Sequence, residues 1–388
     1  MNRYHYNTQS NAKVVLNAVI ARQNGGGATQ IVINYINASL NDDSVEWYYI
    51  VSVELADMLG DVVDYNSAKW LILPRQPQIK SYLKTKHLID SFIRKVKPDV
   101  VYSILAPSYF HFKQKEVMRC CNPWDVIDRD DEAFSFLDYK TKLKFCIKTW
   151  FVRRLMRRSD YFITQTETAK MGIVRVTGID KDKVSVIPNV LPRYFQSVKP
   201  CHKTSNVINI VYVASQAPNK NFEIIPKVAY YLKHVYGLRN FRFLITLSTD
   251  NQYYYRILKD SKALFVESEI VCIGEKTQQE LVDLYNSATI GFFPSVLETF
   301  SATLLEYMYF DLPIVASDKP FNIEILDDAA VYFKSTDADG AANAILSILN
   351  SDDLRNSIVE KSKNRLSKYS DYNQHYKDTI SLFSQISR

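Results

Sequence analysis

The sequence predicts an α/β protein built from two doubly wound domains, and three observations support this fold class. The chain has 388 residues, about twice the usual domain length of roughly 100–200 residues. Short apolar runs alternate with longer stretches of helical periodicity along the whole chain, which is typical of βαβ units with parallel strands. Hydrophobic residues make up 47% and charged residues 23% of the chain, a balance that excludes extensive disorder.

The first half of the chain contains the strands of one expected domain. Its clearest short apolar runs are Val14–Ala21, Trp47–Val53, Val100–Ile104 and Tyr161–Thr164. Basic residues precede the first run, as they would in a signal peptide, but Asn17 interrupts it and a glycine-rich turn follows directly. A first strand explains this segment better than a signal peptide does.

The second half contains further runs of the same kind, enough for a second domain. These are Ile208–Val213, Phe241–Leu247, Ile270–Ile273, Thr289–Phe293, Ile314–Ala316 and Ala330–Phe333. Between the two sets lie a proline-flanked segment, residues 186–192, and the polar residues 196–206. Because prolines interrupt regular structure and polar stretches are exposed, we place residues 1–192 in the first domain and 193–371 in the second. Two final helices are expected at Asp352–Lys368 and Asn373–Ile386.

Charge and cysteine content narrow the expected partners and location. A net charge of +6 favours anionic partners such as nucleotides, phosphorylated lipids and acidic membrane surfaces. The five cysteines show no metal-ligand spacing, and we interpret them as reduced thiols of a cytoplasmic protein. No stretch approaches the roughly 18 uninterrupted apolar residues of a membrane span, so any membrane contact would be peripheral.

The most informative segment is Gly291–Glu306, in which a strand gives way to a helix near Ser301. The unpaired amides of Phe300–Thr303 would then offer a site for a diphosphate. Glu298 can reach the hydroxyls of the group that the diphosphate carries, and Glu306 can accept both hydroxyls of a ribose. Two glutamates with this spacing also occur on solvated helices, so the pair alone leaves both interpretations open.

With its surroundings, this segment resembles the E-x7-E motif of retaining glycosyltransferases of the GT-B fold, the family 4 or glycosyl transferases group 1 type. Four further segments carry the resemblance, in the order of the family. They are Gly25-Gly26-Gly27 after the first strand, Lys183–Val190 before the domain boundary, Ile273-Gly274-Glu275 with the helix after it, and Leu312–Ser317. The resemblance covers about residues 13–370 and implies two Rossmann-like domains that face one another across a cleft.

Two positions carry the catalysis that the resemblance implies. Glu298 matches the glutamate that contacts the hydroxyls of the donor sugar, and Lys220 matches the lysine that neutralises the departing diphosphate. A cation at this position stabilises the charge that grows as the glycosidic bond breaks. The alternative interpretation of Lys220 is a solvated lysine at the start of a helix.

The donor-binding positions follow from the same resemblance. Glu306 would contact the ribose, and Gly274 would lie beside the nucleobase. The other expected donor contacts are Thr299, Phe300, Ser301 and Ser215, with Phe300 and Ser301 supplying backbone amides to the diphosphate. The family commonly has arginine at Ser215, and a hydroxyl cannot replace that charge. Asp311 stands where the family usually ends a helix with glycine, which tolerates left-handed geometry better.

The first domain offers weaker candidates. Gly25, Gly26 and Gly27 permit close approach of a ligand to the backbone, although a plain turn uses the same residues. His111 is expected to overhang the cleft and to orient a donor or acceptor hydroxyl, although a lone histidine among aromatic residues is often simply packed. The acidic run of residues 125–132 is interpreted as a solvated loop that can still line the acceptor side.

Residues 140–158 contain eight Lys or Arg and no acidic residue. At helical spacing, one face combines apolar with cationic side chains, namely Leu143, Ile147, Trp150, Arg154, Arg157 and Arg158. Such a face suits an anionic membrane, and Trp150, Arg154, Arg157 and Arg158 are the expected membrane contacts. Packing against a neighbouring element is the alternative. No nucleic-acid module accompanies the helix, so we expect no nucleic-acid partner.

These features predict a retaining glycosyltransferase that moves a hexose-type sugar from a nucleotide-sugar to a lipid-linked glycan acceptor. The resemblance implies synthesis of a bacterial surface polysaccharide, such as O-antigen or capsule, with no metal or other cofactor. The first domain would bind the acceptor, the second would bind the donor, and the last helix, residues 372–388, would cross back to the first. We expect the protein in the cytoplasm, peripheral on the cytoplasmic face of the inner membrane. The alternatives are a non-catalytic GT-B partner of another glycosyltransferase and a peripheral membrane or anion-binding protein.

Overall fold

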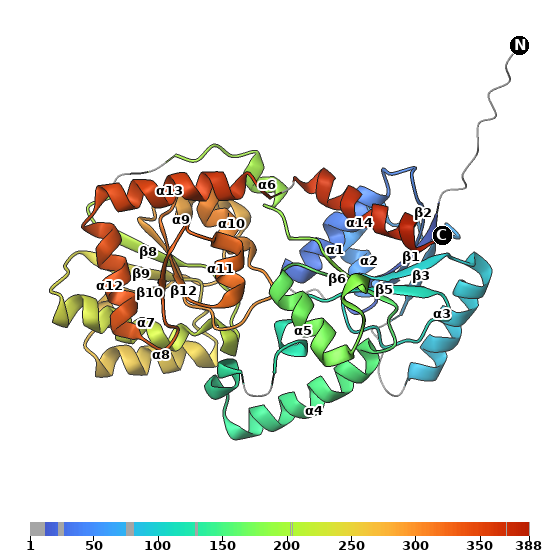
Figure 1. Ribbon diagram of the computed structural model, residues 1–388, viewed down its shortest axis with the longest axis horizontal. Coiled ribbons are helices and arrows are strands. Elements are labelled where there is room, and N and C mark those ends of the chain that lie inside the picture. Colours follow the sequence, from blue (N-terminus) through green and yellow to red (C-terminus); the bar gives the residue numbers. More distant parts are fainter. Residues whose placement is uncertain are drawn as a thin grey trace, which may run out of the picture.

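The structure is a computed structural model that describes residues 12–21, 27–74, 81–128, 131–201, 203, 205–369 and 371–387. Two domains lie side by side, each with a β-sheet between layers of helices (Figure 1). Every strand pairing within the described residues is parallel. The predicted α/β class with two doubly wound domains is therefore confirmed.

The N-terminal sheet has seven strands in the order β3-β2-β1-β4-β5-β6-β7. Their bounds are β1 Lys13–Asn17, β2 Glu46–Ser52, β3 Trp70–Leu73, β4 Val100–Ser103, β5 Lys115–Arg119, β6 Tyr161–Thr164 and β7 Val184–Val186. The chain starts in the middle of the sheet, runs to the β3 edge and then returns to the other side of β1, which is the doubly wound order. In such sheets, ligands bind beyond the carboxyl ends of the strands where the order reverses.

The sequence patterns do not predict β3 and β5. Charged residues conceal β5, because Glu116 and Arg119 interrupt its apolar pattern and yet are buried, with 2% and 0% of their surface exposed. Nη2 of Arg119 donates to Oδ1 of Asn189 at 2.6 Å, and Nη1 lies 3.4 Å from Nε2 of His375. Tertiary partners thus hold inside the protein a charge that a pattern alone would place on the surface.

Among the described residues, five helices from the first half of the chain flank the N-terminal sheet. They are α1 Gly27–Ser39, α2 Val53–Leu59, α3 Tyr82–Val96, α4 Tyr139–Met156 and α5 Glu167–Thr177. Ser52, Asp138 and Thr166 accept hydrogen bonds from the first-turn amides of α2, α4 and α5, so side chains adjacent to each helix set its start. Helix α4 forms the lower edge of the molecule in Figure 1.

The C-terminal sheet repeats the same order with six strands, β10-β9-β8-β11-β12-β13. Their bounds are β8 Ile208–Tyr212, β9 Phe241–Ile245, β10 Ile270–Cys272, β11 Ile290–Phe293, β12 Ile314–Ser317 and β13 Val331–Phe333. The helices are α6 Arg193–Gln196, α7 Ile225–Tyr230, α8 Gln252–Ala263, α9 Gln278–Asn286, α10 Ala302–Tyr309, α11 Pro320–Leu326, α12 Ala338–Leu349 and α13 Asp352–Leu366. One continuous apolar core joins the sheet to these helices.

The last helix, α14 Tyr372–Ile386, packs on the N-terminal domain (Figure 1). Tyr376 and Phe383 lie in the same core as β1, β2 and β4. The ring of Phe383 contacts Tyr102 at a centroid distance of 5.0 Å, and the hydroxyl of Tyr376 donates to Asp42 at 2.8 Å. The end of the chain thereby ties the two domains together.

Helix α10 ends without glycine. Asp311 adopts a left-handed conformation with φ of +52°, and its amide donates to the carbonyl of Met308 at 3.3 Å. Its carboxylate lies 3.6 Å from Nζ of Lys363. Aspartate is among the few residues with a side chain that adopt this geometry regularly, so the helix ends where the family places glycine.

Candidate functional site

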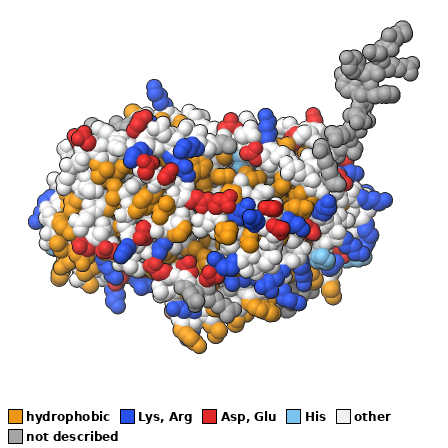
Figure 2. Space-filling model, viewed as in Figure 1, with side chains coloured by type: hydrophobic (Ala, Val, Ile, Leu, Met, Phe, Trp, Pro, Cys, Tyr) orange, Lys and Arg blue, Asp and Glu red, His pale blue; other side chains and the backbone are white. Residues whose placement is uncertain are grey.

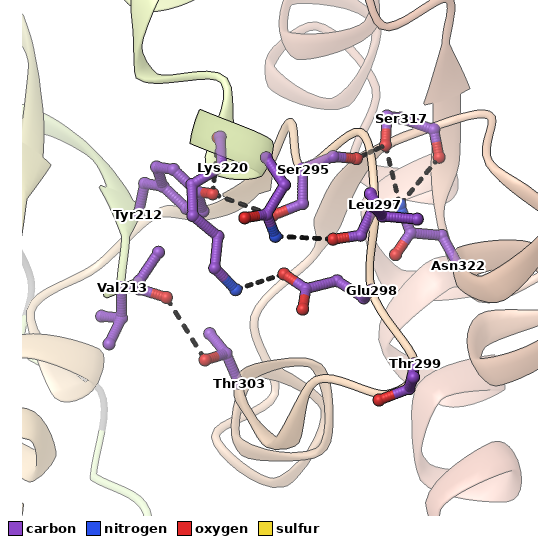
Figure 3. A network of polar contacts seen from close by, with 12 residues as sticks. Tyr212, Val213, Lys220, Ser295, Leu297, Glu298, Thr299, Thr303, Ser317 and Asn322 are labelled. Carbon is purple, nitrogen blue, oxygen red and sulfur yellow. Dashed lines mark hydrogen bonds and ion pairs between the residues drawn. The ribbon is translucent and has the colours of Figure 1, made fainter. Parts of the chain in front are cut away.

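The segment that joins β11 to α10 is held to a second loop of the same domain (Figure 3). Asn219 makes the connection, because its carbonyl accepts from the amide of Val296 at 2.8 Å and its side-chain amide donates to the carbonyl of Leu297 at 2.7 Å. Asn221 adds bonds to the carbonyls of Pro294 at 3.2 Å and Ser335 at 2.8 Å. Hydrogen bonds to backbone groups therefore place the loop of Lys220 beside the segment that carries Glu298.

Lys220 and Glu298 form an ion pair at this junction. Their side chains are only 13% and 9% exposed, so water screens their attraction less than it would on the surface. When a ligand binds, each of these two charged groups can exchange its partner for a ligand group of opposite charge or for a hydroxyl. Residues that lie 78 positions apart in the chain thus meet as the resemblance implies.

Buried hydroxyls support this pair from behind. The hydroxyl of Tyr212 donates to the carbonyl of Lys220 at 2.7 Å and lies 3.0 Å from Oγ of Ser295. The hydroxyl of Ser317 donates to the carbonyl of Ser295 at 2.6 Å. Figure 3 shows these groups on the inner side of the loop, away from the carboxylate of Glu298. The loop is therefore anchored before any ligand binds.

The N-terminus of α10 lies next to this loop. Ser301 is its N-cap residue, but no side chain caps the first turn. The hydroxyl of Thr303 donates to the carbonyl of Val213 at 3.2 Å, which ties the helix start to the end of β8. First-turn amides without a side-chain cap, at the positive end of a helix dipole, form a site for phosphate groups.

Glu306 lies inside α10 and is buried, with 7% of its surface exposed. The hydroxyl of Tyr285, on α9, donates to its carboxyl group. Burial raises the pKa of Glu306 to about 7, and the hydrogen bond from Tyr285 opposes that shift. A carboxyl group that is half protonated near neutral pH can both donate to and accept from ribose hydroxyls.

Gly274 and Ser215 follow two strands of the C-terminal sheet, β10 and β8, which β9 separates. Gly274 follows β10 with φ of +70°, and its amide donates to the carbonyl of Leu247 at 3.2 Å. Ser215 is exposed in the loop that follows β8. Because β9 and β8 separate β10 from β11, a donor that contacts both Gly274 and Glu298 must lie across the carboxyl ends of those two strands.

A cleft of about 370 Å³ lies between the domains, and Glu298 lines it. Its other wall includes Asp128, Asp131 and Glu132 of the N-terminal domain. Glu132 forms an ion pair with Lys319 and accepts from the hydroxyl of Ser335 at 2.7 Å. Burial opposes these two contacts, but together they hold the pKa of Glu132 below its usual value.

Further contacts close the domains on each other. The hydroxyl of Thr299 donates to the carbonyl of Cys121 at 3.0 Å, and its carbonyl accepts from the hydroxyl of Thr166 at 3.0 Å. The carboxylate of Glu324 accepts from the amide of Glu167 and, at 2.9 Å, from that of Thr168, both at the start of α5. Phe300 is buried against Tyr369, with 8% of its surface exposed. Thr299 and Phe300 are thus part of the domain interface as well as of the candidate donor site.

Of the other N-terminal candidates, the structure describes Gly27 and His111, and neither lines the interdomain cleft. Gly25 and Gly26 lie outside the described residues, and Gly27 is the first residue of α1. His111 is exposed and does not line the interdomain cleft, while its neighbours Phe110 and Phe112 pack with α3. A contribution of His111 or of the glycines to ligand binding stays a prediction.

The acidic run of residues 125–132 is not simply a solvated loop. Asp125 is 1% exposed, and burial raises its pKa to about 6, against a bond from the Asn122 amide. Arg153 of α4 donates to the carbonyls of Asp125, at 3.0 Å, and Ile127. The interpretation as a solvated loop is wrong for Asp125, because the backbone bonds to Arg153 hold the segment against α4.

Helix α4 exposes the apolar and basic face that the sequence predicts. The exposed fractions of Leu143, Ile147 and Trp150 are 53%, 63% and 60%. Arg154, Arg157 and Arg158 follow on the same helix end and are also exposed. Within the part of the chain that the structure describes, no helix combines the length and apolar character needed to cross a bilayer.

Sequence reasoning missed several residues that shape the site. Asn219 and Asn221 carry no chemistry of their own, but the Pro-Asn-Lys-Asn run is a turn signal that would have drawn attention to them. Lys319 and Glu324 form contacts across the domain interface and leave no local pattern. Such partners become visible only once the two domains are placed together.

Comparison with known proteins identifies the domain that holds most of this site. Residues 199–365, which include Lys220, Glu298 and Glu306, match the family described as glycosyl transferases group 1. The matched residues make up most of the C-terminal domain. A curated relative, the O-antigen chain mannosyltransferase RfbU of Salmonella typhimurium (strain LT2), is 25% identical over 195 residues, which make up 50% of this chain and 52% of the relative. The chain thus spans about half the length of the curated relative that it matches.

Comparison with solved structures shows similarity over both domains and not only over the C-terminal domain. A glycosyltransferase from Rickettsia africae aligns with a TM-score of 0.72 at 16% identity, covering 97% of this chain and 99% of that one. HepE from Anabaena, solved in complex with UDP and glucose, aligns with a TM-score of 0.68 at 12% identity, covering 96% of this chain and 100% of that one. The predicted GT-B fold is therefore confirmed.

Proposed function

We propose that the protein is a retaining glycosyltransferase that moves a hexose from a nucleotide-sugar to a glycan acceptor. The observation that carries the proposal is the Lys220–Glu298 pair, in which Glu298 lines the interdomain cleft and both residues lie on loops next to the start of α10. A cation and first-turn amides suit a departing diphosphate, and a carboxylate suits sugar hydroxyls. The group 1 family match spans all three elements.

The proposed reaction breaks the bond between the anomeric carbon and the donor diphosphate. A bond from the acceptor oxygen to the same carbon forms on the same face, and the acceptor proton passes to the departing phosphate oxygen. Lys220 and the α10 amides stabilise the charge that grows on the diphosphate. Glu298 accepts hydrogen bonds from the sugar hydroxyls, and Glu306 binds the ribose. Neither step requires a metal ion or a redox partner.

Names of related proteins support the substrate classes. HepE was solved with UDP-glucose, and RfbU is an O-antigen chain mannosyltransferase. On this basis we propose a nucleotide-sugar as the donor and a hexose as the transferred sugar. The proposed acceptor belongs to a bacterial surface polysaccharide and is carried on lipid. The N-terminal domain would bind that acceptor, because it forms the opposite wall of the cleft.

The exposed face of α4 supports peripheral attachment to the cytoplasmic face of the inner membrane. Exposed aromatic and apolar residues beside arginines suit the interfacial zone of an anionic bilayer. Each lysine or arginine near such a surface contributes about 1 kcal/mol. Attachment there would bring the cleft to a lipid-linked acceptor.

Thermal unfolding with UDP, GDP, ADP and their sugars tests the proposal. A ligand at 100 times its Kd stabilises the protein by about 2.7 kcal/mol, so the matching nucleotide is expected to raise the Tm clearly. A nucleotide that binds should also be released from its sugar donor when acceptor is added. Binding without any release would favour the non-catalytic partner, for which the missing cation at Ser215 is the supporting feature. No shift with any nucleotide would contradict the proposed function.

A further inference from the structure

A second hollow lies on the surface beside α4. Its volume is about 330 Å³, and it is lined by Asp128, Trp150, Arg153, Arg154 and Arg157. We infer that this hollow binds the phosphate or diphosphate group of an amphiphilic acceptor, and so positions the acceptor glycan at the interdomain cleft. The inference rests on the proposed function, and it adds a specific acceptor site to general membrane attachment.

The three arginines of the hollow are engaged to different extents. Arg153 donates to two backbone carbonyls of residues 125–127, and Arg157 donates to the carbonyl of Val176 through Nε at 3.3 Å and Nη2 at 3.1 Å. Arg154 is exposed and has no hydrogen-bond or ion-pair partner among the described residues. Its guanidinium can therefore bind phosphate oxygens in the bidentate manner typical of arginine.

The charge of the hollow remains positive although a carboxylate lies in its wall. Asp128 forms an ion pair with Arg175, with 2.8 Å between Oδ1 and Nε. Arg157 keeps its full charge, because its hydrogen bonds go to a neutral carbonyl. Arg154 and Arg157 therefore face the hollow as cations, and the carboxylate in its wall already has a partner, which favours a phosphate group.

An apolar stripe leads into the hollow along the same helix. Leu143, Ile147 and Trp150 are exposed, and their spacing of three to four residues places them on one face of α4. The stripe is about 10 Å long at 1.5 Å per residue, and it ends at Trp150 in the wall of the hollow. Figure 2 shows hydrophobic and basic side chains along the lower edge of the molecule, where α4 lies. Along α4, apolar side chains are followed by a tryptophan and then by arginines, an order that suits a ligand with an apolar chain and a phosphate head group.

The hollow adjoins the cleft of the candidate active site. Asp128 lines both cavities, and Asp131 and Glu132 continue from it along the wall of the cleft that faces Glu298. A glycan attached to a phosphate in the hollow would therefore enter the cleft past these carboxylates. Carboxylates accept hydrogen bonds from sugar hydroxyls, so the acidic wall suits the glycan as the arginines suit its phosphate.

Farnesyl diphosphate tests this site on the full chain, with inorganic diphosphate and farnesol as partial probes. Binding is followed by calorimetry and by the fluorescence of Trp150, with Trp150→Phe identifying its signal. We expect farnesyl diphosphate to bind more tightly than either partial probe. Arg154→Gln should weaken its binding at least about tenfold, the effect of losing a charged hydrogen-bond partner.

Arg158→Gln is the matched control, because it removes the same charge from the same helix end without lining the hollow. It should change farnesyl diphosphate binding less than about twofold, since exposed charges at a distance are screened. Both variants should weaken binding to phosphatidylglycerol vesicles to a similar degree, because a charged bilayer attracts every basic residue near it. Thermal unfolding of each variant checks that the fold is intact.

Equal losses of farnesyl diphosphate binding in Arg154→Gln and Arg158→Gln would overturn the site in favour of diffuse attraction. Farnesol or inorganic diphosphate that binds as tightly as farnesyl diphosphate would also overturn it, because the site needs both parts of the amphiphile. If these tests fail while a nucleotide still stabilises the protein, only the acceptor site is lost. If no nucleotide binds, the proposed function fails whatever farnesyl diphosphate does.

Discussion

The two walls of the interdomain cleft are built in different ways. On the C-terminal side, Glu298 lines the cleft and pairs with Lys220, and bonds within the same domain, through Asn219 and Tyr212, hold both residues in place. The N-terminal wall is held on one side by Arg153 and on the other by the contact of Glu132 with Lys319 of the opposite domain. The Lys220–Glu298 pair is therefore held within one domain, whereas the acceptor wall depends on how the domains meet.

This difference bears on how each half of the site would act. A rigid donor wall provides charges and amides in position before the diphosphate leaves, which is the arrangement that stabilises a transition state best. An acceptor wall that depends on domain contacts can adjust when the domains move. The following experiments test this contrast, from the largest expected effect to the smallest.

Substitution of Lys220 should give the largest effect. Lys220→Met removes the cation that faces the diphosphate, so kcat is expected to fall roughly 100- to 1000-fold, as for the loss of one preorganised charge-stabilising group. Release of the nucleotide from the donor measures the rate. Lys227→Met, on the exposed side of α7, is the control that should keep full activity. A loss of less than about tenfold in Lys220→Met would show that the rigid donor wall does not carry the catalysis.

The buried carboxyl group of Glu306 should make the free energy of unfolding depend on pH. Burial raises its pKa from 4.5 to about 7, so the folded state keeps a proton that the unfolded state releases between these values. The free energy of unfolding should therefore fall as pH rises through this window, by roughly 3 kcal/mol for this group at 1.36 kcal/mol per pKa unit. Glu306→Gln removes this contribution, and urea unfolding at pH 5 and pH 8 measures it.

Two comparisons isolate the contribution of Glu306. Burial raises the pKa of Glu116 to about 7 and that of Asp125 to about 6. Both groups therefore also make the free energy of unfolding of the wild type fall as pH rises. Glu267→Gln, at an exposed position, should keep the full pH dependence of the wild type. Glu306→Gln should also weaken nucleotide binding. An unchanged pH dependence in Glu306→Gln would contradict the buried position of this carboxyl group.

The domain contact of Glu324 should have a smaller effect. Glu324→Gln weakens the bonds to the amides at the start of α5, which are worth roughly 1 kcal/mol to a charged acceptor at a helix N-terminus. We expect the KM for the acceptor to rise several-fold while donor binding changes little, and small-angle scattering to report a wider molecule. Glu360→Gln, exposed on α13, is the matched control. Equal losses for donor and acceptor would contradict the contrast between the two walls.

Ser215→Arg should have the smallest effect, and we expect it to increase kcat/KM for the donor. An arginine here restores the second cation that the family commonly has near the diphosphate. Because the position is exposed, screening limits the gain to roughly 0.5–1 kcal/mol, or a few-fold in kcat/KM for the donor. The gain should shrink at high salt. A variant that binds the nucleotide no better than the wild type at low salt would show that Ser215 lies away from the diphosphate.

The sequence predicts the donor wall better than the acceptor wall for a physical reason. Glu298, the start of α10 and Glu306 lie within one short segment, in which periodicity predicts a strand followed by a helix and the family resemblance marks the two glutamates. Strand β5 escapes prediction because Arg119 finds its partners, Asn189 and His375, far away in the chain. The assignment of Asp125 to a solvated loop fails for the same reason, since Arg153 holds its backbone from another element.

The sequence by itself determined the α/β class and the two doubly wound domains, because local periodicity and turn chemistry act within a few residues. Its resemblance to a known family marked the segment of Glu298 and Glu306. Tertiary structure alone decided the pairing of Lys220 with Glu298, the burial of Glu306 against Tyr285, and the contacts of Glu132 and Glu324 across the domains. Such contacts join residues that are far apart in the chain, and no local preference specifies them. They form only when the sheets and their loops have been packed together.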